Sequence, residues 1–456
     1  MTDLVYASAH VLASQIAARE ISAVEVVSAA IERAEAVQSR VNCIAIPLHD
    51  EALAAARAAD ARQARGEVLG PLHGVPITIK DGVATAGHVN SFGSASKQND
   101  IAAVDDIVWQ RLKAAGVILI GKTTAPEFFH RITTDSPLYG VTRNPWSLAH
   151  SPGGSSGGAA AALAAGVGAL AVGSDGGGSL RCPAAWTATV AIKPTMGRVP
   201  HGSFSNTFSN YSTIGPMARN VRDLSTMLDV MAGPAAADSA SIGRTVVAHD
   251  AAQRLRIGVL RLANVDAEVG RATDAAIGQL ADGGAEIVDF DGSILDGAFD
   301  CYRVISSVGQ ATRLRTTPAA AQALWTESFR ALVAEGVTYS AVDYEVAQQR
   351  RTGLFRAMQA LFESIDVLAS PVSTTPPFLV EAESSVGSDA YAVAAAALYP
   401  FNLTGHPALS VPCGFTGQGL PVGLQLVAPW YHEARLLALA ARLEPDQLWD
   451  GRRPEL

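Results

Sequence analysis

Two glycine- and serine-rich segments contain the residues that could do chemistry, residues 152–158 (PGGSSGG) and 173–181 (GSDGGGSLR). Glycine allows the backbone to bend sharply or to approach a ligand closely, and a serine hydroxyl becomes a nucleophile when a base activates it. The segments flank an uncharged, alanine-rich stretch, residues 159–174, which we interpret as a buried, closely packed helix. This arrangement favours a functional site over two flexible surface loops.

Two rival kinds of site can be compared with these segments. A phosphate-binding P-loop needs Lys and then Ser or Thr after its last glycine, but two alanines follow here. Residues 153–157 satisfy the G-x-S-x-G pattern of α/β-hydrolase esterases, which requires a strand just before the serine. Residues 144–152 contain two prolines and polar residues, so no strand is expected there. Such an esterase would also need a histidine, and His406 and His432 are the plausible ones; replacing both would test it.

The N-terminal part of the chain predicts alternating helices and strands. Ser22 and Glu25 form a capping box ahead of apolar residues at helical spacing. Residues 75–80 alternate in apolar content like a strand, which places Lys80 at a strand's end. The further elements expected here are helices over residues 22–37, 50–64 and 106–115, a buried parallel strand over 117–120, and a loop over 123–156. Loops of that length in compact proteins are usually functional.

The remainder of the chain continues the same alternation. The predicted helices cover residues 221–231, 274–281, 341–363 and 433–443, and the predicted strands cover 257–260, 287–290, 367–370, 408–412 and 422–427. This order predicts an α/β fold, a single large mixed β-sheet covered by helices on both faces. Since no linker interrupts the sequence, we expect one domain over residues 1–456.

Composition narrows the class of protein. Hydrophobic residues make up 48% of the chain and charged residues 17%, which is typical of a soluble globular protein. The net charge of −9 and the lack of a Lys/Arg run argue against a nucleic-acid or membrane partner, and favour a small-molecule substrate. The four cysteines are far apart, without zinc-ligand spacing, and indicate free thiols in a cytoplasmic protein without a metal. No secretory signal is recognisable at the N-terminus, and residues 159–174 are too short for a membrane span of ~20 residues.

The chain resembles the amidase signature family. The resemblance rests on Lys80-Asp81, on residues 152–158 and on residues 173–183. Further matches occur in the expected order at residues 70–76 (GPLHGVP), 139–140 (YG), 144–146 (NPW), 192–195 (IKPT) and 401–407 (FNLTGHP). The resemblance therefore covers nearly the whole chain, with the signature core at about residues 70–220 and a more variable, substrate-side region at about 230–400.

The resemblance implies a Ser–cis-Ser–Lys triad. Residue by residue, it assigns Ser179 as the nucleophile, Ser155 as a relay that follows a cis peptide bond, and Lys80 as the base. The two serines lie 24 residues apart in the sequence, each at the family's position in its motif. We expect the neighbouring Asp81 to point away from Lys80, because an ionised carboxylate close to the amine would oppose its deprotonation.

The resemblance also implies an oxyanion hole formed by backbone N–H groups of Gly176, Gly177, Gly178 and Ser179, where each donor can be worth ~3 kcal/mol. It assigns supporting roles to three polar residues, Ser156, Asp175 and Arg181. By analogy, residues 127–132 (EFFHRI) line the acyl pocket, so the candidate specificity residues are Phe129, His130 and Ile132. This chain departs from the family at Gly176, where Thr is frequent, and at Arg131, which either meets an acidic substrate or faces solvent.

These features predict an amidohydrolase that cleaves a C–N acyl bond of an amide, anilide or carbamate (urethane), and also esters, through an acyl-enzyme without a cofactor. Two alternatives stay open: the A subunit of a tRNA-dependent amidotransferase, which works with partner subunits, and an α/β-hydrolase esterase. Gly176 and Cys182 weakly disfavour the amidotransferase. We expect a monomer or homodimer.

Overall fold

The apolar runs of the chain form one eleven-stranded sheet through the centre of the computed structural model. The structure describes residues 3–202, 206, 208, 210–243, 255–443 and 452–456. The sheet strands are β1 (Ile44–Pro47), β2 (Pro76–Lys80), β3 (Ile118–Thr123), β6 (Leu170–Asp175), β7 (Val190–Lys193), β8 (Thr213–Ala218), β9 (Arg256–Arg261), β10 (Glu286–Asp291), β11 (Val367–Pro371), β12 (Ala408–Phe415) and β13 (Pro421–Val427). A separate two-stranded ladder pairs β4 (Asp135–Ser136) with β5 (Gly140–Val141).

The sheet is mixed, with the order β1-β3-β2-β6-β8-β7-β12-β13-β11-β9-β10. Strands β3, β2 and β6 are parallel to one another, and so are β11, β9 and β10 near the other edge. The pairs between β6 and β11 are antiparallel. The predicted mixed sheet is therefore confirmed.

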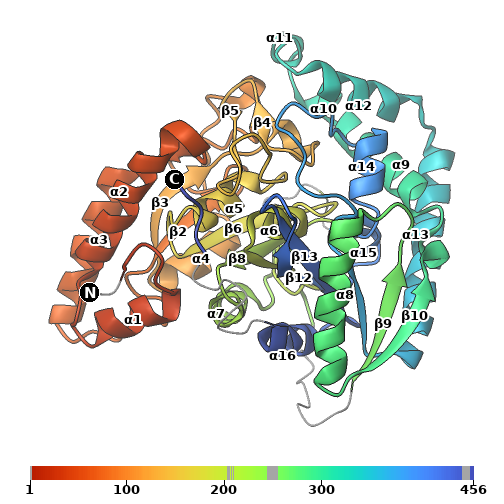
Figure 1. Cartoon of the computed structure of the whole chain (residues 1–456). Helices are drawn as coiled ribbons and strands as arrows, with labels where there is room; N and C mark the ends of the chain where they lie inside the picture. The colour runs from red at the N-terminus through yellow and green to blue at the C-terminus, as the bar shows by residue number, and fades with distance from the viewer. Residues whose placement is uncertain (1–2, 203–205, 207, 209, 244–254, 444–451) are drawn as a thin grey trace.

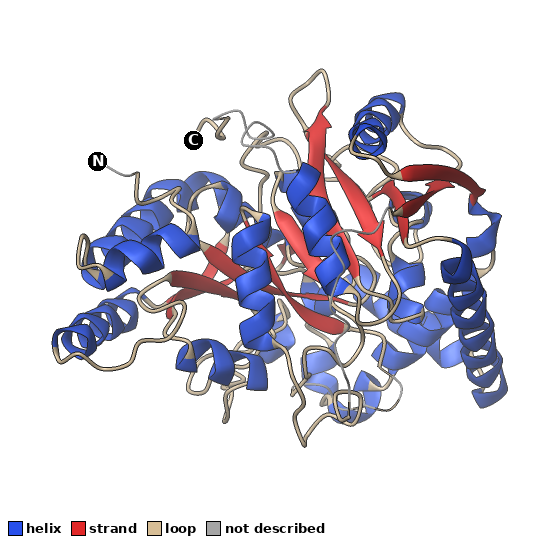
Figure 2. Cartoon of the chain, turned by 90° about the horizontal axis from the view of Figure 1, so that it is seen from below, coloured by secondary structure: helices blue, strands red, loops and turns tan. Residues whose placement is uncertain are grey.

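Helices cover both faces of this sheet (Figures 1 and 2). Helices α5 and α6 pack on one side of the central strands, and α7, α8 and α16 pack along the other. In the N-terminal half the helices are α1 (Ala9–Ala17), α2 (Ala23–Val41), α3 (His49–Ala64), α4 (Ile107–Ala114), α5 (Gly157–Ala164), α6 (Arg181–Thr187) and α7 (Val221–Met231). In the C-terminal half they are α8 (Ala267–Asp282), α9 (Ala298–Ala311), α10 (Arg313–Thr316), α11 (Ala319–Gln322), α12 (Glu327–Thr338), α13 (Ala341–Ser364), α14 (Asp389–Ala394), α15 (Tyr399–Leu403) and α16 (Glu433–Leu443).

One sequence interpretation is wrong: residues 159–174 are not a single helix. Helix α5 ends at Ala164, and the chain then turns through Gly166 and Gly168, whose φ angles are +81° and +75°. The following residues form β6, a central strand. A fully buried helix and a fully buried strand both carry small apolar residues without a polar face, so periodicity does not separate them.

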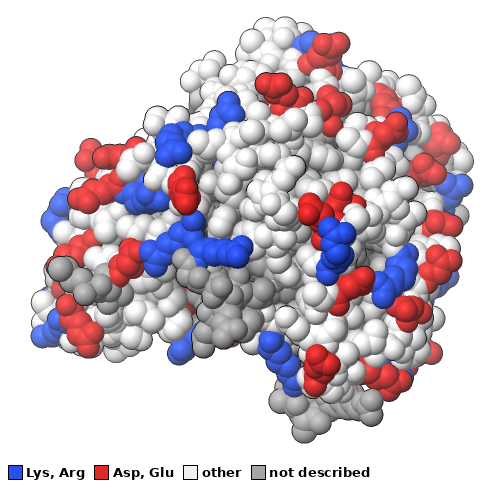
Figure 3. Space-filling model, in the orientation of Figure 1, with Lys and Arg blue, Asp and Glu red and all other residues white. Residues whose placement is uncertain are grey.

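Charged side chains of both signs are mixed on the surface. On the face shown in Figure 3, acidic and basic side chains are interspersed around a largely uncharged centre. Within the described residues, no helix combines the length and the apolar character needed to cross a bilayer.

The sheet brings the two glycine- and serine-rich segments to Lys80. Strands β2 and β6 are parallel neighbours, with Ile79 opposite Val172. Their carboxyl ends, at Lys80 and Asp175, therefore lie at the same edge of the sheet, where α/β proteins commonly bind ligands. Helix α5 begins at Gly157, within the first segment, and α6 begins at Arg181, the last residue of the second.

Candidate active site

Lys80 is completely buried at the end of β2 and is surrounded by serine hydroxyls. Its Nζ lies 2.7 Å from Ser155 Oγ, 3.1 Å from Ser156 Oγ and 3.0 Å from Ser174 Oγ. The ring of Phe129 covers a further side of the amine, with Nζ 4.0 Å from the ring centroid. The amine is thus held in a dry site by neutral groups.

Burial in this site lowers the pKa of Lys80 well below its usual range, and the more distant carboxylates of Asp175 and Asp81 oppose that shift only in part. Asp81 accepts hydrogen bonds from the N–H groups of Ser91 (3.0 Å) and Gly93 (3.1 Å), and it also contacts the Ser91 hydroxyl. The expected orientation of Asp81 away from Lys80 is confirmed, because its carboxylate is held by the 91–93 segment.

The first segment places Ser155 and Ser156 beside this amine. The peptide bond between Gly154 and Ser155 is cis, as the resemblance implies. Ser156 ties the two segments together, because its N–H donates to the carbonyl of Ser179 (3.1 Å) and its Oγ donates to the carbonyl of Ser174 (3.1 Å). The first segment is therefore fixed to the second through backbone and side-chain bonds.

Ser179 differs from Ser155 in its exposure. Both serines border a cavity, but Ser155 is fully buried, whereas Ser179 is partly exposed. Within the part of the chain that the structure describes, the Ser179 hydroxyl makes no side-chain hydrogen bond. Ser179 is therefore the more accessible serine of the predicted triad.

The glycine loop after β6 is held by Asp175, which changes one expectation about the oxyanion hole. The Asp175 carboxylate accepts from the N–H groups of Gly178 (2.7 Å) and Leu180 (3.1 Å). Gly178 therefore braces the loop, and its N–H is not available to a ligand. Among the described residues, the N–H groups of Gly176, Gly177 and Ser179 have no protein acceptor, and all three residues line the cavity.

Arg181 completes this brace as the buried partner of Asp175. Its Nε lies 3.0 Å from Asp175 Oδ2, and both side chains are completely buried. Asn402 donates to Asp175 Oδ1 and accepts from Arg181, while Gln425 also accepts from Arg181. Burial alone would raise the pKa of the Asp175 carboxyl, but Arg181 and the hydrogen bonds from Arg181 and Asn402 outweigh burial and hold that pKa below its usual range.

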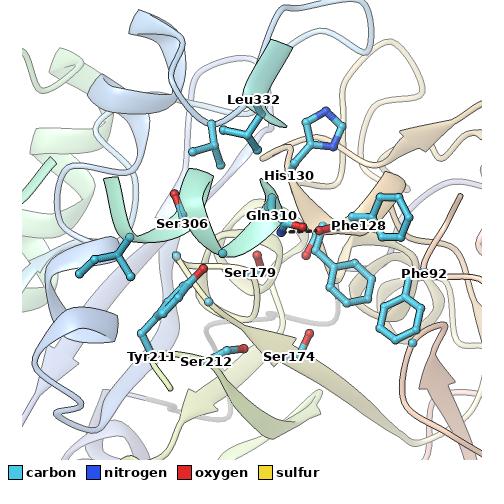
Figure 4. Close-up of a pocket in the computed structure, with 18 of the residues that line it drawn as sticks. Phe92, Phe128, His130, Ser174, Ser179, Tyr211, Ser212, Ser306, Gln310 and Leu332 are labelled. Carbon is cyan, nitrogen blue, oxygen red and sulfur yellow. Dashed lines mark hydrogen bonds between the residues drawn. The ribbon is translucent and has the colours of Figure 1, made fainter. Parts of the chain in front are cut away.

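A cavity of about 620 Å³ opens onto Ser179 (Figure 4). Phe92 and Phe128 lie on one side of Ser179 in this view, and Tyr211 lies on the other. From the resemblance we expected Phe129, His130 and Ile132 to line the acyl pocket, and all three border this cavity. A mainly apolar cavity of this size with a few polar groups is typical of a small-molecule site.

His130 and Arg131 are both occupied by the protein. The His130 ring nitrogens bond to the carbonyl of Glu127 (2.6 Å) and to Ser328 Oγ (2.9 Å), and burial lowers the pKa of His130 to about 4. Arg131 forms an ion pair with Asp135 at 2.9 Å, which answers the question that the sequence left open for this residue.

Sequence reasoning gave no role to three groups that the structure brings to the site. Ser174 contacts the Lys80 amine, Asn402 bonds to Asp175 and Arg181, and the Tyr391 hydroxyl donates to the carbonyl of Gly177 (3.2 Å). Ser174 and Asn402 lie inside motifs that were recognised, so position within a motif was the available signal. Tyr391 lies in α14, far from these motifs in the sequence, and no sequence pattern indicated its role.

Other site chemistries find little support in this arrangement. The hydrogen-bond partner of the Ser155 hydroxyl among the described residues is Lys80 and not a histidine, and the residues before Ser155 form a loop. The esterase elbow is therefore not supported. The described residues contain no group of three or more His, Cys, Asp or Glu side chains arranged to hold a metal ion.

The chain belongs to the amidase family, whose pattern it matches over residues 25–437. It is 35% identical over 485 residues to the A subunit of the glutamyl-tRNA(Gln) amidotransferase of Moorella thermoacetica, covering 100% of this chain and 99% of that protein. It is 34% identical over 466 residues to an acylamidase of Rhodococcus erythropolis, covering 99% and 98%. Among solved structures, 6-aminohexanoate cyclic dimer hydrolase is 28% identical with a TM-score of 0.89, covering 100% of this chain and 99% of that one. A bacterial aryl acylamidase of the amidase signature family has the same identity and TM-score, with 99% of each chain covered.

Proposed function

We propose that this protein is a serine amidohydrolase with Ser179 as the nucleophile, Ser155 as the relay and Lys80 as the base. The observation that carries the proposal is the buried Lys80 amine, which lies 2.7 Å from Ser155 Oγ and has a pKa lowered by burial. A neutral amine has a lone pair that can accept the proton of the Ser155 hydroxyl. Ser155 can in turn take the proton from Ser179 as the latter attacks.

The reaction begins when Ser179 Oγ forms a bond to the substrate carbonyl carbon. The Ser179 proton moves to Ser155, and the Ser155 proton moves to Lys80. The C–N bond then breaks, and the leaving amine takes a proton back along the same path. Water then attacks the acyl carbonyl and passes a proton through Ser155 to Lys80; as the ester bond to Ser179 breaks, that proton returns to Ser179 Oγ and the acid is released.

The oxyanion of the tetrahedral intermediate needs donors in the glycine loop. We assign this role to the N–H groups of Gly176, Gly177 and Ser179, because the N–H of Gly178 is bonded to Asp175. Asp175 and Arg181 support the loop from the buried side, and Ser156 supports Lys80. Removing one oxyanion donor typically costs about 10²–10³ in kcat.

The substrate class extends from amides and anilides to carbamates and esters. Attack on a urethane carbonyl followed by loss of the alcohol gives a carbamoyl-enzyme, and water then releases a carbamic acid that loses CO2 to give the amine. The relatives named acylamidase and aryl acylamidase support C–N cleavage, while urethane cleavage rests on the chemistry alone.

A second candidate is an amidotransferase A subunit, which the 35% identity to that protein of Moorella thermoacetica favours. The two functions differ in what the isolated chain does. We expect the purified chain alone to release nitroaniline from acyl nitroanilides, with Ser179→Ala as the inactive control. Absence of hydrolysis by the chain alone, together with turnover on addition of partner subunits, would favour the amidotransferase.

Several sequence predictions accompany this proposal. We propose that residues 1–456 form one domain, which the continuous eleven-stranded sheet supports. The expected small-molecule substrate, the monomeric or homodimeric state, the cytoplasmic location and the independence from cofactors stay predictions.

A further inference from the structure

Arg313, at the start of α10, lines the same cavity as Ser179. Its guanidinium carbon lies 4.2 Å from the ring centroid of Phe128 and 5.8 Å from that of Phe92. Stacking on aromatic rings is a common way of holding an arginine while its nitrogens stay available for hydrogen bonds.

Gln310 fixes the orientation of this guanidinium from the protein side. Its Oε1 accepts from Arg313 Nε at 2.9 Å, and its Nε2 donates to the carbonyl of Phe128 at 3.4 Å, the bond drawn dashed in Figure 4. Within the described part of the chain, the two terminal nitrogens of Arg313 make no hydrogen bond. The fork of donors that usually binds a carboxylate is therefore left for a molecule in the cavity.

Arg313 also lacks the counter-ion that its cationic neighbours have. Among the described residues that line the cavity, Lys97 is paired with Asp100 and Arg131 with Asp135, but Arg313 contacts no carboxylate.

Glu127, the carboxylate whose charge acts on Arg313, is bonded to other groups. The electrostatic influence of Glu127 reaches Arg313, but Glu127 Oε1 accepts from Ser94 Oγ (2.7 Å), and its Oε2 accepts from the N–H (2.8 Å) and the hydroxyl (2.6 Å) of Thr326. Burial lowers the pKa of Arg313 to about 10, so the side chain is charged at neutral pH. The Arg313 guanidinium is thus a partly buried cation in the cavity that pairs with no carboxylate among the described residues.

We propose that Arg313, oriented by Gln310, is a carboxylate-binding subsite, so that favoured substrates carry a carboxylate at a distance from the bond that is cleaved. A guanidinium and a carboxylate can form two parallel hydrogen bonds, which gives both strength and direction. The proposal rests on the amidohydrolase function and adds a substrate class to it.

Two aromatic rings, those of Phe92 and Phe129, connect Arg313 with the Lys80 amine. Phe129 lies over the Lys80 amine, Phe92 lies 5.5 Å from Phe129, and the Arg313 guanidinium carbon lies 5.8 Å from the Phe92 ring centroid. Since two rings connect Arg313 to the Lys80 amine, we choose test substrates with a benzene ring or a short alkyl chain between the scissile amide and the carboxylate.

Matched substrate pairs test the proposal on either side of the scissile bond. On the leaving-group side, 4-acetamidobenzoate is compared with acetanilide. On the acyl side, the mono-p-nitroanilide of adipic acid is compared with hexanoyl p-nitroanilide. We expect the carboxylate member of at least one pair to have the higher kcat/KM, since a charge-assisted hydrogen bond corresponds to about tenfold to hundredfold.

Substitution of the arginine identifies the source of that preference. In Arg313→Gln the ratio of kcat/KM for the carboxylate and neutral members should fall at least tenfold, and Arg313→Lys should retain part of it. The control is Arg315→Gln, an exposed arginine outside the cavity lining, which should leave the ratio unchanged. The proposal would be overturned if the wild type showed no preference in either pair. It would also be overturned if the preference were equal in the wild type, Arg313→Gln and Arg315→Gln.

Binding separates this proposal from the catalytic one. Titration calorimetry with the Ser179→Ala protein should show that the carboxylate member of at least one of the two pairs binds at least tenfold more tightly than its neutral partner, and that adding Arg313→Gln removes the difference. That result would support the subsite even if no substrate were turned over, in which case the amidohydrolase function would be the part that fails. Equal binding of the two members within both pairs would refute the subsite.

Discussion

Replacing Lys80 with methionine should change how the stability of the protein depends on pH. Methionine has a similar length and no titratable group. Burial lowers the pKa of Lys80 in the folded protein, whereas the unfolded chain has a lysine pKa of about 10.4. At a pH between these two values the unfolded chain binds one more proton than the folded protein. The free energy of unfolding of the wild type should therefore rise with pH, by about 1.4 kcal/mol per pH unit.

Besides the distant carboxylates of Asp175 and Asp81, the Phe129 ring opposes this shift and can be compared with burial. The Phe129 ring, 4.0 Å from Nζ, can stabilise an ammonium by up to ~2 kcal/mol, or ~1.5 pKa units. Complete burial lowers lysine pKa values by up to ~3–5 units. Among the described residues no carboxylate lies within ion-pair distance of Lys80. Burial should therefore dominate.

The assay is urea unfolding of wild type and Lys80→Met at several values between pH 8 and 9.5. The stability of the variant relative to the wild type should fall by about 2 kcal/mol over this interval, whatever constant difference the lost contacts with the serines add. Lys113→Met, at an exposed lysine, is the control and should give a constant difference. An equally constant difference for Lys80→Met would mean that Lys80 stays charged in the folded protein, and would refute its role as a neutral base.

Three further results are expected. Lys80→Arg should be nearly as inactive as Lys80→Ala, because arginine keeps a charge but cannot release a proton. The wild-type kcat/KM should rise with pH into the alkaline range. Substantial activity in Lys80→Arg, or a flat pH profile of the wild type, would contradict the role of Lys80 as the base. Asp175→Asn should lower the free energy of unfolding by ~3–5 kcal/mol, because it leaves the buried guanidinium of Arg181 unpaired. The control Asp274→Asn, in an exposed ion pair, should lower it by less than ~1 kcal/mol. Equal losses in the two variants would show that Asp175 and Arg181 do not stabilise the glycine loop. Substitution of Phe129 or Ile132 should alter the relative kcat/KM of different acyl groups more than the rate with the best one, and an unaltered substrate profile would make both residues purely structural.

Elements with a clear pattern were predicted well from the sequence. The helix expected over residues 221–231 is α7, Val221–Met231, and that over 433–443 is α16, Glu433–Leu443. Their hydrophobic residues recur at helical spacing against a polar face. The interpretation failed where this contrast is missing, since residues 159–174 are apolar throughout and contain both a helix and a strand. Strand β8, Thr213–Ala218, was not predicted because Gly215 and Pro216 interrupt its apolar residues.

The site was predictable where it lies inside recognised motifs. The sequence led to Lys80, Ser155 and Ser179, and the structure places Ser155 against the Lys80 amine, with Ser179 in the cavity. The direction of single N–H groups was not predictable, and Gly178 was expected among the oxyanion donors although its N–H bonds to Asp175. Such details depend on the exact path of the loop. Contacts from distant elements, such as that of Tyr391 with Gly177, depend on tertiary packing.

Covalent labelling by a fluorophosphonate probe, followed by peptide mapping with mass spectrometry, identifies the nucleophilic serine directly. We expect one adduct, on Ser179, because this serine is partly exposed in the cavity, whereas Ser155 borders the cavity without exposed surface and is bonded to Lys80. Ser179→Ala should keep its fold, lose turnover and take up no probe. Labelling of Ser155 in the wild type, or full activity of Ser179→Ala, would contradict the assignment of Ser179 as the nucleophile.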